Sequence, residues 1–337
     1  MIYPKFIKKG DTIGVAAPSN GADDEFKINK YNNAKKRLES LGFKLNISKN
    51  INKSYKARSA DKITRAKEMN DMFKNKDIDL IICASGGEFM MEILPYIDFD
   101  NIKNHPKYLC GFSDPTNLLY PVTTLCDIAT IYGSNFTHFG TENLHQSQED
   151  FLDLIKGEKL SIDGYDFYEK ERSKKITGLE DFNLSELVEY KTLDGKDTII
   201  KGRIIGGCFD VINDLLGTKY DGFKLFEKKY KKDGIIWYFD NCNKSYDDTI
   251  LVLLRFKEFG YFDNCNGIIF GRFANTETYV DYDTLTCLKE SVLGDLNIPV
   301  IYDADVSHKY PCLPIINGSI ATIKVSNKKC NISFELK

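Results

Sequence analysis

Metal sites and disulfide frameworks need residues that this chain has in short supply. Its 337 residues include only four histidines, with no H-E-x-x-H motif and no pair of histidines beside a carboxylate, which excludes a zinc carboxypeptidase. The nine cysteines form no C-x-x-C pair, and their odd number leaves at least one unpaired. We therefore expect a reducing compartment, no bound metal and no cofactor.

Long apolar runs and an excess of one charge are also missing. No run approaches the roughly 20 residues of a membrane span, and the N-terminus lacks the long apolar segment of a secretory signal. The 46 basic and 49 acidic residues give a net charge of −3, which argues against a surface built to bind nucleic acid. These observations predict a cytoplasmic protein whose partners include neither a membrane nor a nucleic-acid polymer.

The first half of the chain alternates between strand and helix patterns. The predicted strands cover 12–17, 45–47, 77–84, 108–112 and 129–132. The predicted helices cover 25–41, 60–73, 88–94 and 115–125. This alternation predicts an α/β fold with an open, mostly parallel sheet, whose functional loops lie at the carboxyl ends of the strands.

The rest of the chain predicts a connection and a second domain. A helix and then an exposed polar crossing are expected within 141–195. Beyond it we expect strands at 198–205, 234–239, 267–270 and 300–302, helices at 209–216, 247–259 and 282–293, and a hairpin of 321–325 with 331–334. We divide the chain into an N-terminal domain over 1–160, a polar connection over 161–195 and a smaller C-terminal domain over 196–337.

The most informative motif is a Gly-x-Ser turn between a predicted strand and a predicted helix. The apolar run before it ends at Phe112, and Ser113, Asp114 and Pro115 follow. Pro115 suits the first position of a helix, because the missing N–H costs nothing there. The turn places Ser113 at a helix N-terminus, where partial positive charge favours a developing oxyanion. The pattern is similar to a nucleophile elbow, although it is not the Gly-x-Ser-x-Gly of serine hydrolases.

Three further strand ends carry groups that an acyl-transfer serine enzyme needs. Gly86 and Gly87 follow the strand at 77–84 and offer backbone N–H donors. Asp240 ends the strand at 234–239 with a carboxylate, and His308 comes just past the strand at 300–302. With Ser113 they supply candidates for nucleophile, base, carboxylate and oxyanion donors.

In this order and spacing the motifs resemble the LD-carboxypeptidase family of serine peptidases, which includes the microcin-immunity peptidases. The resemblance runs nearly from end to end. The matching segments are 9–19, 86–87, 94–100, 106–116, 202–211, 216–218, 267–272 and 303–311. The resemblance implies a Rossmann-like N-terminal domain, a smaller C-terminal α/β domain similar to a swivelling barrel, and an active site between them. It also suggests a homodimer.

The resemblance assigns Ser113 as the nucleophile and His308 as the base. His105 and His145 lie in polar stretches and are expected to be solvated. His138 follows a strand end and is a candidate for substrate contact. The ordinary pKa of histidine, near ~6.5, suits a proton shuttle at neutral pH.

The oxyanion donors implied by the family are two backbone N–H groups. One is the N–H of Asp114, directly after the nucleophile. The other comes from the glycine pair, which indicates Gly87 or Gly86, and we also expect Gly86 to contact the substrate. A role for the Asp114 carboxyl as a second acid is the weaker reading.

The carboxylate at position 240 departs from the family, which usually has Glu there. An aspartate is shorter by roughly 1.3–1.5 Å, comparable to a misplacement that costs about 100-fold in rate. We nevertheless assign Asp240 as the third catalytic residue, since Asp serves in many triads. Asp247 and Asp248 are the alternatives, although they look like helix N-terminal charges.

The Gly206-Gly207-Cys208 segment opens a predicted helix after a strand. It favours either an anion-binding site, with Gly207 contacting the substrate, or close packing at a domain junction. A nucleophilic role for Cys208 is the weakest alternative, because its context is that of a small buried hydrophobe.

Three functions remain open at this point. The resemblance implies an LD-carboxypeptidase that removes a terminal D-alanine from cytoplasmic muropeptides during cell-wall recycling. The first alternative is a microcin-immunity-type amidase that cuts peptide–nucleotide or aminoacyl-nucleotide toxins. Trp237, the only tryptophan, lies in a predicted strand, so Tyr or Phe would have to stack on a nucleobase. The second alternative is a catalytically weak ligand-binding protein on the same fold, marked by the aspartate at 240.

Overall fold

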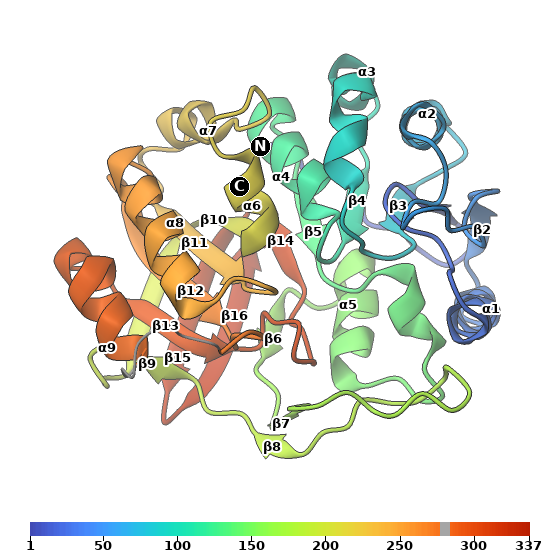
Figure 1. Ribbon diagram of the computed structural model, residues 1–337. Coiled ribbons are helices and arrows are strands. Elements are labelled where there is room, and N and C mark those ends of the chain that lie inside the picture. Colours follow the sequence, from blue (N-terminus) through green and yellow to red (C-terminus); the bar gives the residue numbers. More distant parts are fainter. Residues whose placement is uncertain (277–283) are drawn as a thin grey trace.

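The computed structural model describes residues 1–276 and 284–337. Figure 1 shows two α/β bodies side by side, each built around its own sheet. A parallel-sheet N-terminal domain and a second α/β domain confirm the predicted fold class. Within the described part of the chain, no helix has both the length and the apolar character needed to cross a membrane.

The first sheet has six strands in the order β14-β5-β4-β3-β1-β2, and all but β14 are parallel. Its strands are β1 (Thr12–Ala16), β2 (Lys44–Ile47), β3 (Leu80–Cys83), β4 (Tyr108–Gly111), β5 (Thr130–Tyr132) and β14 (Ile315–Asn317). The central strands β3 and β4 are buried along their whole length. The chain order reverses between β1 and β3, and the loops after these two strands form the crevice where such sheets bind ligands.

Helices on both faces bury the sheet, and their ends follow from local sequence. Asp24 caps α1 (Glu25–Ser40) by accepting the N–H of Lys27, and Asp61 caps α2 (Lys62–Lys74) in the same way. The other helical elements here are η1 (Met90–Tyr96), α3 (Phe99–Asn104), α4 (Thr116–Cys126), η2 (Phe136–Gly140) and α5 (Gln146–Lys156). Side-chain caps satisfy N–H groups that the first turn leaves unpaired.

The second sheet has eight strands in the order β6-β16-β15-β10-β11-β12-β13-β9. Its parallel centre is β10 (Thr198–Cys208), β11 (Ile235–Asp240), β12 (Cys265–Gly271) and β13 (Val300–Ala304). Its antiparallel strands are the hairpin β15 (Ile320–Ser326) and β16 (Lys329–Glu335), with β6 (Ser161–Asp163) and β9 (Lys191–Thr192) at the edges. The described helical elements around this sheet are α6 (Phe209–Leu215), α7 (Phe223–Lys229), α8 (Tyr246–Glu258), α9 (Thr284–Leu288), η3 (Lys289–Leu293) and η4 (Gly294–Leu296).

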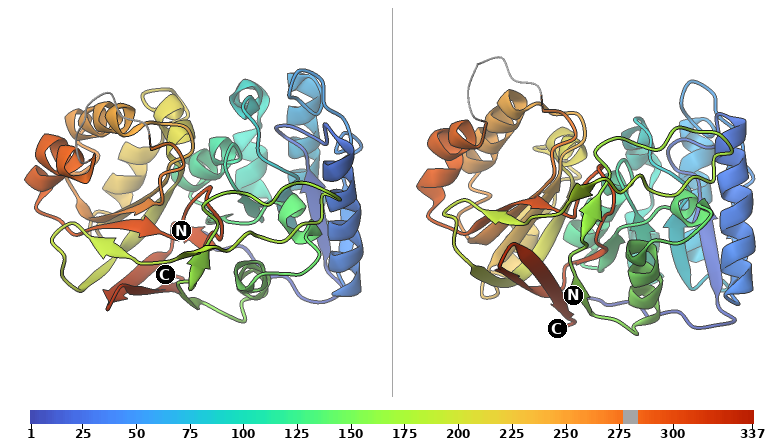
Figure 2. Two further views of the ribbon diagram at one scale, coloured as in Figure 1. Left: turned by 60° about the horizontal axis from the view of Figure 1, so that its bottom comes forward. Right: turned by 90° about the horizontal axis from the view of Figure 1, so that it is seen from below.

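The segment between the sheets is less irregular than predicted. Besides β6 and β9 it contains a two-stranded ribbon, β7 (Phe167–Tyr168) with β8 (Glu186–Leu187). Figure 2 shows the long connection between β7 and β8 reaching from that ribbon to the edge of α1, where Asn29 donates to the carbonyl of Thr177. Strands of two or three residues are too short to carry a periodic signal.

Several other elements differ from the expectation. The predicted helix at 88–94 is the 3₁₀ segment η1, and the short helices α3 and α7 were not predicted. The predicted helix at 282–293 begins outside the described residues, and its described part is α9 followed by a π turn. Strand β14 joins the first sheet from late in the chain, so the sheets do not divide at the predicted domain bounds, which stay a prediction.

Candidate active site

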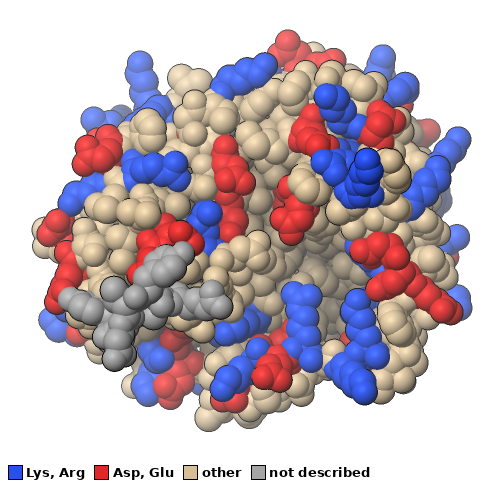
Figure 3. Space-filling view, viewed as in Figure 1, with Lys and Arg blue, Asp and Glu red and all other residues tan. Residues whose placement is uncertain are grey.

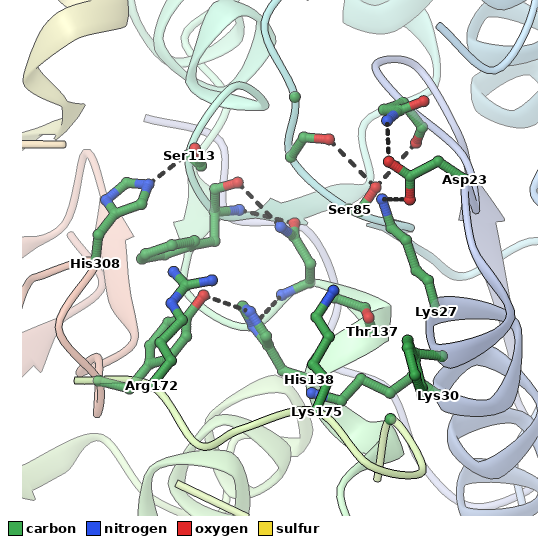
Figure 4. A pocket seen from close by; sticks show the side chains of 18 of the residues that line it. Asp23, Lys27, Lys30, Ser85, Ser113, Thr137, His138, Arg172, Lys175 and His308 are labelled. Atoms are coloured by element: carbon green, nitrogen blue, oxygen red, sulfur yellow. Dashed lines mark hydrogen bonds and ion pairs between the residues drawn. The ribbon is translucent and has the colours of Figure 1, made fainter. Parts of the chain in front are cut away.

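A cavity of about 410 Å³ opens where the strands of the first sheet end. The loops after β1, β3, β4 and β5 line it, together with α1, the β7–β8 connection and the loop after β13. Figure 4 shows Ser113 and His308 pointing toward one another at one end. The sequence pattern placed functional loops at this edge, and the cavity lies there.

Ser113 occupies a sharp turn between β4 and α4. Its φ is +71°, in the left-handed region that a residue other than glycine rarely adopts. Such a conformation costs on the order of 1–3 kcal/mol, and the surrounding structure must hold it. Thr116 donates its N–H to the Ser113 carbonyl at 2.9 Å, so the turn passes directly into the first turn of α4. The serine hydroxyl is thereby presented to the cavity.

Ser113, His308 and Asp240 form one hydrogen-bonded line. The Oγ of Ser113 lies 2.9 Å from Nε2 of His308, and Nδ1 of His308 lies 2.8 Å from Oδ1 of Asp240. A carboxylate only accepts, so Nδ1–H donates to Asp240, and neutral His308 accepts the serine proton at Nε2. Asp240 is fully buried at the end of β11. The shorter aspartate therefore reaches the imidazole directly.

Two opposing effects act on the charge of His308. Burial disfavours the charged imidazole, whereas the carboxylate of Asp240 favours it through its charge and its hydrogen bond with Nδ1. The carboxylate prevails and raises the pKa of His308 to about 10. This corrects the expectation of an ordinary pKa. At neutral pH the resting imidazole is mostly protonated, and its basic form increases as the pH rises.

Tyr132, at the end of β5, is hydrogen-bonded to both ends of this line, at Asp240 and at Ser113. Its hydroxyl donates to Oδ2 of Asp240 at 2.5 Å and accepts the backbone N–H of Ser113 at 3.3 Å. The side chain is fully buried. Both carboxylate oxygens of Asp240 are therefore engaged, one by His308 and one by Tyr132, which fixes the plane of the carboxylate.

The Asp114 carboxylate holds the turn against the glycine loop after β3. It accepts hydrogen bonds from the hydroxyl of Ser19, from the N–H of Met90 at 3.0 Å and from Nδ2 of Asn117 at 2.7 Å. Burial raises its pKa. A Cβ on Gly87 would lie 2.3 Å from Oγ of Ser19, so only glycine fits this close approach. Gly86 and Gly87 both line the cavity beside Ser113, and the carboxyl of Asp114 is occupied structurally.

A buried ion pair holds the loop that carries His308. Arg272 binds Oδ1 of Asp305 through Nη1 at 2.6 Å, and its Nη2 donates to the carbonyls of Lys309 and Pro311. The hydroxyl of Tyr190 donates to Oδ2 of the same aspartate at 2.9 Å. Because these hydrogen bonds hold the loop both before and after His308, they position the imidazole opposite Ser113.

His138 lines the same cavity but takes no part in that line. Its Nδ1 accepts the N–H of Asn135, so Nε2–H donates to the hydroxyl of Tyr310 at 2.9 Å. Burial, together with the charges of Lys30 and Arg172, lowers the pKa of His138 to about 3. His138 is therefore neutral at physiological pH and presents an ordered polar wall to a ligand.

Gly207 does not share this cavity and packs between the domains instead. A Cβ there would lie 2.6 Å from Cγ2 of Thr116, whose Oγ1 accepts the N–H of Cys208 at 3.0 Å. The close-packing alternative thus describes this segment, and the substrate contact predicted for Gly207 stays a prediction. Burial raises the pKa of the Cys208 thiol, which keeps it protonated.

The remaining alternatives lie in structural positions. Asp248 forms the capping box of α8 with Ser245, as expected of a helix N-terminal charge. His105 ends α3, and His145 caps α5 with its ring against Tyr165, and both are half-buried and so only partly solvated.

Sequence reasoning missed Tyr132, Tyr310 and the cations on the far wall. Tyr132 ends a predicted strand, and the rule that sites lie at strand ends would have singled it out. Tyr310 follows His308 by two residues, but only its contact with His138 reveals its place. Lys30 and Arg172 lie far apart in sequence, and no local pattern connects them.

Comparison with known proteins finds relatives over nearly the whole chain. Two family models match, the LD-carboxypeptidase N-terminal domain over residues 13–133 and the LD-carboxypeptidase C-terminal domain over 201–323. The chain is 27% identical to a Vibrio cholerae protein named "Putative carboxypeptidase" (97% of this chain, 96% of that one). It is 24% identical to the Bacillus subtilis "Probable murein peptide carboxypeptidase" (96% and 92%).

The microcin C7 self-immunity protein MccF of Escherichia coli is similarly close. It is 28% identical, over 96% of this chain and 93% of that one. Its solved structure in complex with aspartyl sulfamoyl adenosine matches with a TM-score of 0.84 and 25% identity over 99% of each chain. The two-domain arrangement is thus shared along the full length.

Proposed function

Because the chain belongs to the LD-carboxypeptidase family of serine peptidases, we propose that it is a serine carboxypeptidase that hydrolyses an L-to-D peptide bond next to a free carboxylate. The observation that carries this proposal is the hydrogen-bonded line of Ser113, His308 and Asp240 facing the cavity. The substrate class proposed is a muropeptide from which a terminal D-alanine is released.

The geometry supports a two-step acyl transfer. Oγ of Ser113 attacks the scissile carbonyl carbon while Nε2 of His308 takes the serine proton, and Asp240 stabilises the imidazolium. The N–H groups of Gly87 and Asp114 are proposed to bind the oxyanion. The C–N bond then breaks, His308 gives the proton to the leaving amine, and an acyl ester remains on Ser113. Water, deprotonated by His308, hydrolyses this ester and restores the serine.

The cavity suits a short peptide with a charged end. Its volume of about 410 Å³ lies within the range of small-molecule sites. Four cationic side chains line it: Lys27, Lys30, Arg172 and Lys175. The likeness to a murein peptide carboxypeptidase supports the same substrate class.

The second candidate is an amidase acting on aminoacyl nucleotides, and one observation favours it. Phe182 stacks on Tyr310 beside the cavity, with ring centroids 5.0 Å apart. Both rings are half-buried, and their remaining accessible surface offers a place for a nucleobase to stack. Trp237 offers none, because it is fully buried in the second domain. The likeness to MccF supports this alternative.

The test is hydrolysis of three matched substrates by the full-length protein. We expect release of D-alanine from an L-Ala-D-Glu-L-Lys-D-Ala tetrapeptide, no release from its all-L counterpart, and loss of release in Ser113→Ala. Cleavage of an aspartyl sulfamoyl nucleoside with no turnover of either peptide would replace the first candidate with the second. Saturable binding of the tetrapeptide without turnover would favour the ligand-binding alternative.

A further inference from the structure

The wall of the cavity opposite the glycine loop is cationic. Lys27 and Lys30 come from α1, and Arg172 and Lys175 come from the connection between β7 and β8. Figure 3 shows Lys and Arg side chains gathered along the lower rim of the hollow. In Figure 4 Arg172, Lys175 and Lys30 lie on one side of the cavity, below His308 in the view.

Two of these cations are already paired. Nζ of Lys27 lies 3.8 Å from Asp23, and Nζ of Lys175 lies 3.3 Å from Asp24. In the described part of the chain, Lys30 and Arg172 form no ion pair. Arg172 instead lies over the ring of Tyr310, with Cζ 5.2 Å from the centroid.

Two carboxylates face this pair without forming a close contact. Glu180 accepts the backbone N–H groups of residues 176–178 at one oxygen, at 2.6–3.1 Å. Glu169 is buried and accepts the N–H of Asn183. Both are held by the backbone of their own segment. The side chain of Lys30 is half-buried, and desolvation disfavours its charge, so an incoming anion would be stabilised there.

A series of ring contacts places Arg172 on the imidazole side of the nucleophile. Phe112 contacts His308 with centroids 4.6 Å apart and Tyr310 at 5.7 Å, and Arg172 lies over Tyr310. The imidazolium of a serine hydrolase gives its proton to the leaving amine. Groups bound on this side therefore belong to the leaving half of the substrate.

We infer that Lys30 and Arg172 form the subsite for an anionic group on the leaving half of the substrate. This inference rests on the proposed function and adds the residues that select the substrate. The shared chemistry is an anion close to the scissile nitrogen. In a peptide it is the terminal carboxylate, and in an aminoacyl nucleotide it is the phosphoryl or sulfamoyl group. The planar guanidinium of Arg172 suits two-point contact with either.

The experiment compares acetyl-L-alanyl-D-alanine with its C-terminal amide. We expect wild-type kcat/KM to favour the acid, and Arg172→Met and Lys30→Met each to lower it about 10- to 100-fold for the acid, with little change for the amide. Lys174→Met is the matched control, because Lys174 is an exposed cation of the same segment that does not line the cavity, and its effect should stay below about threefold. An aspartyl sulfamoyl nucleoside and its methylated, uncharged analogue form the second arm and identify which anion is used.

The outcomes separate this inference from the proposed function. Release that depends on Ser113 but shows equal kcat/KM for acid and amide overturns the subsite and leaves the hydrolase intact. If neither peptide is turned over, protection of Ser113 from a fluorophosphonate by the acid and by the amide replaces turnover as the readout. Stronger protection by the acid that is lost in Arg172→Met supports the subsite, and equal protection overturns it. An effect of Lys174→Met as large as that of Arg172→Met also overturns it.

Discussion

The two walls of the cavity are built in opposite ways. On the wall of Ser113, His308 and Asp240, the half-buried Ser113 and His308 and the fully buried Asp240 are bound to one another, with Tyr132 hydrogen-bonded to Asp240 behind them. On the wall of α1 and the β7–β8 connection, Arg172 is exposed and forms no ion pair with any residue that the structure describes. The groups of the first wall are bonded to one another before a substrate arrives, whereas the cations of the second wall gain a charged partner only when an anion binds.

The difference indicates where chemistry and selectivity reside. Catalysis gains most from groups that are positioned in advance and do not reorganise during the reaction. Selectivity gains from charged groups whose partner is supplied by the substrate. Changes on the first wall should therefore lower kcat for every substrate, and changes on the second should lower kcat/KM only for anionic ones.

The largest effect is expected from removing the nucleophile or the base. Ser113→Ala and His308→Ala should each lower kcat by about 10⁴-fold or more, and the double variant should be scarcely worse, because the members of such a line act as a unit. Single-turnover rates on one peptide measure this. If His308→Ala kept a near-normal kcat and His138→Ala lost activity, the general base would be His138, and the comparison between the two walls would fail.

Asp240 is expected to come next. Asp240→Asn should keep the fold and lower kcat about 10⁴-fold, because the amide favours the wrong imidazole tautomer. Asp240→Glu should lower kcat about 100-fold, because the aspartate already reaches His308 at 2.8 Å and an extra methylene displaces the imidazole. Circular dichroism of both variants controls for folding. Full activity of Asp240→Asn would send the search for the carboxylate to Asp247 or Asp248.

The pH dependence reports the same pair. Because the carboxylate raises the pKa of His308 to about 10, the basic form increases with pH, and kcat/KM should rise by up to about tenfold per unit on the acidic side of that pKa. Asp240→Asn removes the raising charge, so its smaller kcat/KM should level off at lower pH. A wild-type profile that is flat above neutral pH would contradict this account of His308.

A smaller effect is expected at Tyr132. Tyr132→Phe leaves Oδ2 of Asp240 without its buried donor, so unfolding free energy should fall by about 1–3 kcal/mol. We also expect kcat to fall about 10-fold with little change in KM, because the carboxylate is less well oriented. Tyr108→Phe on β4 is the matched control, since that buried hydroxyl has no hydrogen-bond partner among the described residues. Equal loss of stability in both variants would remove the positioning role.

Local sequence predicted the first wall much better than the second. The Gly-x-Ser turn and the strand ends at Gly87 and Asp240 carry local signals, and the structure brings these segments together with His308. The pKa of His308 is raised by the carboxylate of the fully buried Asp240. Residue types alone do not show which side chains are buried together, so the sequence could not predict this shift. Lys30 and Arg172 meet only because the β7–β8 connection crosses to α1, and that crossing has neither periodicity nor a motif.

Labelling with a fluorophosphonate tests the central claim most directly, because it needs no knowledge of the substrate. We predict one adduct per chain, located on Ser113 by peptide mass spectrometry. It should be absent in Ser113→Ala, much slower to form in His308→Ala and Asp240→Asn, and formed at the wild-type rate in Arg172→Met. The account is contradicted by a folded protein that forms no adduct, by an adduct at another residue, or by labelling of Ser113 that does not slow when His308 is replaced.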